Sequence, residues 1–175
     1  MGVQNIKRSS IWKIRLSTAT MTLIPAAVGI NYVAKAFAEG LKLPVWLGSL
    51  GTFLASMLAG PVAGAISGFI NHVIYGLTLS PVSTVYAITG IGIGIAVGVL
   101  HAKGWFSSAK KVFVSAIIIA IVSAVISTPL NVIFWGGQTG IPWGDSIFAA
   151  MIANHIPVWI SSFTDEFILD ILDKV

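Results

Sequence analysis

Apolar residues fill most of this chain in long blocks, which short polar or turn-forming stretches interrupt. Each interruption combines charge with Gly or Pro, or supplies a strong turn dipeptide. The interruptions lie at residues 39–44, 60–61, 80–81, 103–111 and 136–145. Between them the pattern predicts six helices, at residues 17–38, 45–59, 61–79, 82–101, 110–135 and 146–169. The second helix is short, so we expect it to be tilted or partly re-entrant, which leaves a five-span arrangement open.

Composition decides where such helices belong. Of the 175 residues, 56% are hydrophobic and 9% are charged, and the mean hydropathy is +0.93. An average soluble domain has about 25% charged residues, and a helix needs roughly 20 apolar residues to cross about 30 Å of hydrocarbon. The sequence therefore predicts an all-α integral membrane protein, a single domain over residues 1–175 built as a compact bundle of six transmembrane helices. Cysteine is absent, which excludes disulfides and thiolate chemistry.

The placement of charge predicts an orientation. Basic residues cluster before the first predicted helix and between the fourth and the fifth. They are Lys7, Arg8, Lys13, Arg15, Lys103, Lys110 and Lys111. By the positive-inside rule, both chain ends are cytoplasmic, and we interpret residues 4–16 as an interfacial lead-in rather than a cleaved signal. Lys35 and Lys42 are then expected outside, against the rule.

With this orientation, polar and aromatic residues of several helices fall in the outer half of the membrane. A polar group without a partner in hydrocarbon costs several kcal/mol, so these side chains should face the bundle interior. We predict a substrate-binding layer made of Asn31, Tyr32, Asn71, His72, Tyr75, Tyr86, Asn131, Trp135, Asn154 and His155, with Gln138 and Trp143 in a lid loop. The alternative is that these groups only link helices through hydrogen bonds.

The predicted layer contains no Lys, Arg, Asp or Glu. The absence of charged side chains argues against a proton relay or an ion-coupled carrier of the acidic type. A neutral, aromatic cavity suits an organic molecule. Two histidines without a nearby carboxylate make a thin coordination set, so we expect no resident metal or other cofactor. Near the end of the chain, Asp165, Glu166, Asp170 and Asp173 are interpreted as the solvated inner end of the last helix, or as a docking face.

Two glycine series predict close helix packing. Spacing by four places each series on one helix face, where missing side chains let two backbones approach. The series are Gly60, Gly64 and Gly68, and Gly90, Gly94 and Gly98. The text GIGIGIAVG lies within an apolar helix rather than after a strand, which argues against a dinucleotide loop. No hydrolase motif and no GxxxxGK[ST] phosphate loop occur, so we expect neither an enzyme nor a chain that hydrolyses ATP by itself.

Three segments together resemble one family of membrane proteins. They are MTLIPAAVGINYV (21–33), LPVWLGSLGTFLASMLAGPVAGAISGFINHVIYG (43–76) and VYAITGIGIGIAVGVLHAKGWF (85–106). The chain is similar to the S components of energy-coupling factor (ECF) vitamin transporters, a class of ABC transporter. The resemblance implies a multi-pass subunit of the bacterial cell membrane that captures a vitamin or precursor at the outer face, under the loops after the first, third and fifth helices. It implies partners too: a transmembrane coupling subunit and two cytoplasmic ATPases.

Within that family the chain is most similar to the cobalamin-type S components and their neighbours for queuosine precursors, so the expected ligand is cobalamin, with a queuosine precursor or another vitamin as alternatives. The small-residue coupling face of the family's first helix corresponds to Thr18, Thr22 and Ala26, and Gly48 replaces an Asp that members often have. Lipid is the expected surrounding, and no nucleic-acid partner is expected. A structural or regulatory membrane subunit without a ligand remains the alternative of another class.

Overall fold

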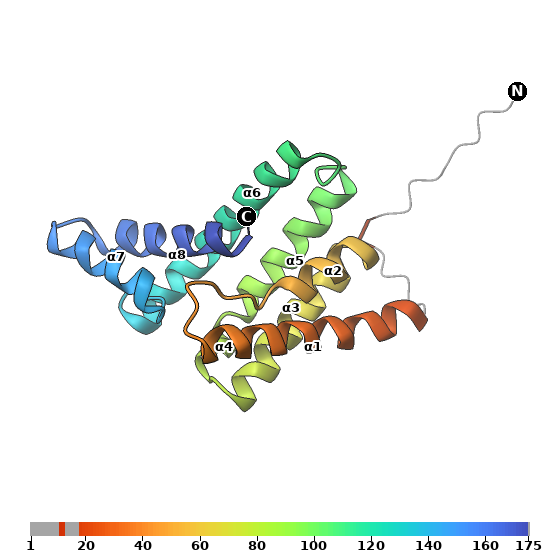
Figure 1. Cartoon of the computed structure of the whole chain (residues 1–175), viewed down its shortest axis with the longest axis horizontal. Coiled ribbons are helices and arrows are strands. Elements are labelled where there is room, and N and C mark those ends of the chain that lie inside the picture. The colour runs from red at the N-terminus through yellow and green to blue at the C-terminus, as the bar shows by residue number, and fades with distance from the viewer. Residues whose placement is uncertain (1–10, 13–17, 175) are drawn as a thin grey trace, which may run out of the picture.

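The structure is a computed structural model that describes residues 11–12 and 18–174 (Figure 1). Throughout that part it consists of eight helices and contains no strand, which confirms the all-α prediction. The helices are α1 (Thr18–Gly40), α2 (Leu50–Ala59), α3 (Pro61–Thr78), α4 (Val82–Val85), α5 (Ala87–Ala102), α6 (Ala109–Trp135), α7 (Pro142–Ala153) and α8 (Val158–Lys174). Apart from residues 11–12, the predicted lead-in at 4–16 lies outside the described residues.

The junction between α2 and α3 is a direct reversal. Gly60 ends α2 with φ 92°, and Pro61 is the first residue of α3. Glycine adopts a positive φ without steric cost, and proline loses nothing at the first helical position, where the N–H would be unpaired. The second helix is shorter than predicted because residues 45–49 belong to the preceding loop, in which Leu47 has φ 47°.

Two predicted helices are each divided in the structure. The helix predicted at 82–101 consists of α4 and α5, which meet at Tyr86. The helix predicted at 146–169 is a hairpin of α7 and α8, and this corrects the single sixth span. His155 has the left-handed φ of 61°, and Pro157 disfavours helical geometry at the residue before it. These two residues explain why α7 ends before α8 begins.

Helices α5 and α6 lie between the two ends of the bundle and connect them through their packing. Helices α1, α2 and α3 pack on one another, α5 packs on α2, α3 and α6, and α6 packs on α8. The hairpin of α7 and α8 lies at one end of the molecule, and the C-terminal end of α8 returns toward the centre (Figure 1). This arrangement brings the last helix close to the loop that follows α1.

The contact between α3 and α5 is made by backbone. The glycines in it are Gly64, Gly68, Gly90, Gly94 and Gly98. A Cβ atom at Gly94 would lie 2.3 Å from the backbone carbon of Gly64, and one at Gly68 would lie 2.4 Å from the carbonyl oxygen of Gly90. Any larger residue would separate the helices. Gly60 is not part of this face, since it forms the α2–α3 turn.

The exterior is apolar and the interior is small and polar. Large hydrophobic side chains are exposed on several helices, among them Val33 (68%), Leu58 (71%) and Leu77 (79%). Buried positions in the described part hold many Ala, Ser, Thr and Asn residues and several charged ones, beside an apolar cluster of Ile93, Val97, Leu100 and Ile119. By length and composition, α1 and α6 are each able to cross a membrane, and α2 and α5 are apolar but shorter.

Candidate functional site

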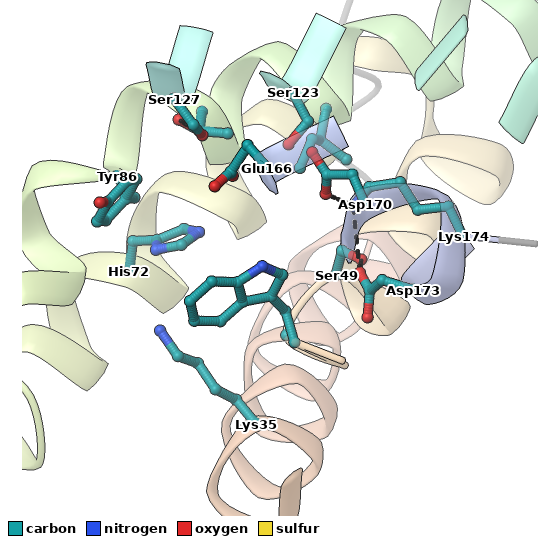
Figure 2. Close-up of a pocket in the computed structure, with 14 residues that line it drawn as sticks. Lys35, Ser49, His72, Tyr86, Ser123, Ser127, Glu166, Asp170, Asp173 and Lys174 are labelled. Carbon is teal, nitrogen blue, oxygen red and sulfur yellow. Dashed lines mark hydrogen bonds and ion pairs between the residues drawn. The ribbon is translucent and has the colours of Figure 1, made fainter. Parts of the chain in front are cut away.

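A cavity of about 70 Å³ lies where α1, α3, α5, α6 and α8 meet the loop formed by residues 41–49 (Figure 2). One water needs roughly 10–15 Å³ measured in this way, whereas pockets for drug-sized ligands measure about 300–1,000 Å³. The cavity therefore has room for a small molecule or a few waters. It is lined by Lys35, Trp46, Gly48, Ser49, His72, Tyr86, Thr89, Ile93, Ser123, Ser127, Glu166, Asp170, Asp173 and Lys174.

Helical spacing explains how these residues reach one place. Residues three or four apart lie on the same face of a helix. Glu166, Asp170 and Lys174 follow one another at intervals of four along α8, and Ser123 and Ser127 do the same on α6. Each of these helices therefore presents a polar stripe to the cavity.

The loop 41–49 folds back into the bundle and forms one wall of the cavity. The amide of Asn71, in the middle of α3, donates to the carbonyl of Gly48 at 3.3 Å. The backbone N–H of Leu47 donates to Asp173 Oδ1 at 2.7 Å. The loop is thus fastened on one side to α3 and on the other to the end of α8.

Lys35 carries a buried positive charge into the cavity from α1. Its ammonium donates to Ser83 Oγ at 2.8 Å, lies 4.0 Å from Glu39 Oε1 and sits 4.4 Å from the centroid of the Tyr75 ring. The residue is 6% exposed, so these contacts replace much of its hydration. The short helix α4 has a clear role here, because it places Ser83 beneath the ammonium.

His72 continues the same network. Its Nδ1 lies 3.1 Å from Ser83 Oγ and 3.2 Å from the carbonyl oxygen of Ser83. The carbonyl oxygen can only accept, so its hydrogen bond with the ring requires a proton on Nδ1, and Ser83 Oγ can accept from the same N–H. This network assigns the tautomer with the proton on Nδ1. The Nε2 of His72 is then a hydrogen-bond acceptor.

The end of α8 holds an ion-pair cluster. Lys174 pairs with Asp170 and, at 3.2 Å, with Asp173. These residues lie beyond the span predicted at 146–169. Burial alone would lower the pKa of Lys174, but the two neighbouring carboxylates raise that pKa above its ordinary value, so the ammonium stays charged. Asp173 serves twice, since it also accepts the hydrogen bond of the loop.

A second network orients Glu166. The Tyr86 hydroxyl donates to Asn131 Oδ1, and Asn131 Nδ2 donates to Glu166 Oε2 at 3.0 Å. The chain of bonds crosses from α5 through α6 to α8. Asn131 is fully buried behind the cavity, and Glu166 is 4% exposed within its wall. Asn131 therefore positions the carboxylate and does not line the space.

The structure distributes the predicted site residues unevenly. His72 and Tyr86 line the cavity, whereas Asn31, Asn71, Tyr75 and Asn131 lie behind its walls. Asn31 Oδ1 accepts from the backbone N–H of Gly51 at 2.6 Å, and its amide donates to Thr52 at 2.9 Å. It thereby satisfies the first turn of α2, whose N–H groups have no partner within their own helix.

The remaining predicted residues lie outside the cavity. Tyr32 packs edge-on against Tyr75, with ring centroids 5.2 Å apart. The others are exposed: Trp135, Gln138, Trp143, Asn154 and His155. The division of the sixth helix accounts for the last three, because α7 and the turn after it lie at the end of the molecule. These residues do not form the predicted lid over the cavity, which the loop 41–49 covers instead.

The predicted absence of charge is wrong for this cavity. Lys35, Glu166, Asp170, Asp173 and Lys174 all line it, so the argument against charge-dependent binding loses its basis. The acidic residues near the chain end are buried as well, and not solvated. A signal was present in the sequence, since Glu166, Asp170 and Lys174 are spaced by four, as are Asn31 and Lys35.

No protein-family model matches the chain, and neither a curated protein nor a solved structure was found to match it. Among the residues that the structure describes, no group of three or more His, Asp or Glu side chains could hold a metal ion. The chemistry of the site therefore rests on its own geometry: a small cavity with ammonium groups, carboxylates, hydroxyls and a neutral imidazole among the residues of its walls.

Proposed function

We propose that this chain is the substrate-binding membrane subunit, the S component, of an ECF-type transporter, and that it captures a small vitamin or vitamin precursor for uptake. The observation that carries the proposal is a cavity lined by charged side chains inside a helical bundle whose outer surface is apolar. A concave cavity with polar groups from five helices suits specific binding. A bundle that served only as a scaffold would have no use for it.

The distribution of side chains supports a membrane location. Exposed residues such as Val33, Leu58 and Leu77 would form large apolar patches in water, and lipid would cover them. Lys35 is buried, so it is not counted among the basic residues of an outer loop. Only Lys42 is then left against the positive-inside rule. We propose a multi-pass membrane subunit in which the α7–α8 hairpin replaces the predicted single sixth span, and in which the end of α8 lies beside the loop that follows α1.

An exposed stripe on α1 supports a coupling partner. Thr18, Thr22 and Ala26 are all exposed. The hydroxyl of Thr22 donates back to the carbonyls of Thr18 and Ala19 at 3.1 Å each, so the residue offers its methyl group outward. A smooth, small-residue face of this kind lets another helix approach closely in lipid. We propose that it contacts a transmembrane coupling subunit, which carries two cytoplasmic ATPases.

The size of the cavity bears on the substrate. About 70 Å³ is far below the volume of cobalamin, the ligand expected from the resemblance. Binding of cobalamin would require the loop 41–49 and α8 to separate. We therefore propose a much smaller vitamin or precursor as the substrate, and the queuosine-precursor alternative remains closer to this size than cobalamin does.

Co-purification tests the proposed assembly. The tagged chain is extracted in mild detergent from its native membrane, and bound proteins are quantified by mass spectrometry. We expect one coupling subunit and two ATPases for each chain. Ala26→Trp should remove them by blocking the α1 stripe, whereas Val125→Trp, at a 56% exposed position of α6, should keep them. Recovery of the chain without ATPases, or equal recovery with Ala26→Trp, would contradict the proposal.

The alternative of a structural or regulatory subunit draws support from the amides. Asn31 and Asn71 link helices and loops, as interhelical polar contacts do in many membrane proteins. A subunit of this kind would need no ligand. The two functions differ in one measurable respect. Only the transporter subunit should bind a small molecule, and this binding should depend on Glu166.

A further inference from the structure

The charges in the cavity wall are unevenly matched. Three carboxylates line it, from Glu166, Asp170 and Asp173, against the ammonium groups of Lys35 and Lys174. Lys174 is shared between Asp170 and Asp173. Lys35 is held by contacts to Glu39, Ser83 and Tyr75 rather than by a carboxylate of the wall. The wall therefore has an excess of negative charge on the α8 side.

Burial makes this excess costly. Glu166 is 4% exposed and Asp170 is 1% exposed. Asp170 Oδ2 has no partner in good hydrogen-bond geometry, and Glu166 Oε2 accepts a hydrogen bond from the neutral amide of Asn131. A buried carboxylate without a matching cation is unfavourable by several kcal/mol. A cation inside the cavity would remove that cost.

The two ends of the cavity differ in chemistry. Figure 2 shows Glu166 and Asp170 on one side, with Lys35 and His72 on the other. The first side accepts hydrogen bonds and favours positive charge. The second side carries the ammonium of Lys35, which donates hydrogen bonds and favours an electron-rich group. A molecule that spans the cavity would need opposite properties at its two ends.

We infer that the cavity binds a small molecule with a protonated amine at one end, held by Glu166 and Asp170, and a carboxylate or carbonyl group at the other, held by Lys35. A bare metal ion fits less well, because the described residues offer no set of three ligating side chains. The inference rests on the proposed function in one respect: it assigns the substrate class of the same cavity.

A series of ω-amino acids tests the inference directly. The purified chain is unfolded by heat in detergent, followed by tryptophan fluorescence, with glycine, β-alanine, 4-aminobutyrate or 5-aminopentanoate at equal ionic strength. Butylamine and butyrate serve as probes for the amine and the carboxylate alone. A ligand that binds only the folded state raises Tm. We expect at least one amino acid to raise Tm by several degrees, butylamine by less, and butyrate not at all.

Three variants locate the binding. Glu166→Gln keeps an acceptor for Asn131 but removes the charge, and should weaken binding by at least about tenfold, as expected for a lost charged hydrogen bond. Lys35→Met should reduce the response to the amino acid to that of butylamine. Asp165→Asn is the matched control, because Asp165 is a buried acid of the same helix that does not line the cavity. It should keep the full shift.

Specific results would overturn the inference. They are the absence of any shift with the four amino acids, a shift with butyrate as large as that with the amino acids, or an unchanged response in Glu166→Gln. A loss of response in Asp165→Asn would also count against it, because the effect would then follow α8 rather than the cavity. If the chain fails these tests but co-purifies with its ATPases, the transporter function stands and the substrate class falls. Binding without ATPases would have the reverse meaning.

Discussion

At the scale of single residues, each buried polar side chain has one of two roles, and its hydrogen-bond partners decide which. Asn31 directs both ends of its amide to the start of α2, so its bonding capacity is used inside the fold. Asp170 leaves one oxygen without a partner beside the cavity. The first kind of residue stabilises the bundle, and the second kind is free to meet a ligand.

Asn31→Leu should destabilise the protein. The substitution removes the acceptor for the N–H of Gly51 and leaves Thr52 without its partner, so we expect a loss of about 2 kcal/mol. Asn154→Leu is the matched control, because that exposed amide bonds only to the carbonyl of Ala150 in its own helix. It should change stability by less than about 0.5 kcal/mol. Thermal unfolding in detergent measures both, and equal effects would refute the assignment.

Replacing either of two aspartates in the α7–α8 hairpin by asparagine should change the stability of the protein, with opposite signs at the two positions. Asp165 is fully buried, and neither of its oxygens meets a donor in good hydrogen-bond geometry. Asp165→Asn should therefore raise the free energy of unfolding, by about 1–3 kcal/mol. Asp145 Oδ1 accepts from the backbone N–H groups of Thr139 and Gly140, at 3.0 and 3.2 Å. Asp145→Asn weakens these bonds and should lower Tm. A shift of the same sign in both variants would contradict this account.

At the scale of helices, the sequence predicted where helices begin and end better than it predicted breaks within them. The Gly60–Pro61 reversal follows from local chemistry, and α3 and α6 begin and end within one residue of prediction. The break after α7 was missed because Asn154 and His155 were interpreted as polar residues within one span. Pro157 was a usable signal. The left-handed turn at His155 has no equally clear mark in the text.

The α3–α5 contact should depend on Gly94 far more than on its neighbour Gly92. A Cβ at position 94 would meet the backbone of α3 at 2.3 Å, whereas one at position 92 would meet the terminal methyl of Ile126 at the same distance. A methyl group at the end of a flexible side chain moves aside, and a packed helix backbone does not. We expect Gly94→Ala to lower the free energy of unfolding by about 1–3 kcal/mol, as overpacking of a well-packed core does. Gly92→Ala should lose clearly less in the same thermal assay.

At the scale of the whole molecule, composition and periodicity predicted an all-helical chain with an apolar exterior, since both depend on sums over many residues. The location of the cavity could not be predicted in this way. It depends on the rotation of each helix and on the return of α8 to the loop 41–49, which are set by long-range contacts. His72 and Tyr86 were identified from depth alone. Lys35 and Glu166 were missed because charge in a predicted span was interpreted as an outer or a solvated position.

Asp173 joins the last helix to the loop 41–49 through hydrogen bonds from Leu47 and, at 3.5 Å, from Ser49 Oγ, and weakening them should open the molecule at a defined place. Asp173 Oδ1 accepts the backbone N–H of Leu47 at 2.7 Å, although the two residues are 126 positions apart. Leu47 has φ 47°, a conformation that costs a residue with a side chain some energy and therefore needs such support. Asp173→Asn provides a weaker, neutral acceptor, so the loop 41–49 should leave the cavity more often.

Limited trypsin digestion in detergent measures that opening within one sample. Lys42 lies in the loop 41–49, and Lys103 lies in the loop between α5 and α6, far from Asp173 in the chain. We expect Asp173→Asn to accelerate cleavage after Lys42 severalfold and to leave cleavage after Lys103 unchanged. Faster cleavage at both sites would indicate general destabilisation, and no change at Lys42 would show that the loop is held by other contacts. Because Asn71 still holds Gly48 in this variant, the opening should be partial, and adding Asn71→Leu should increase it further.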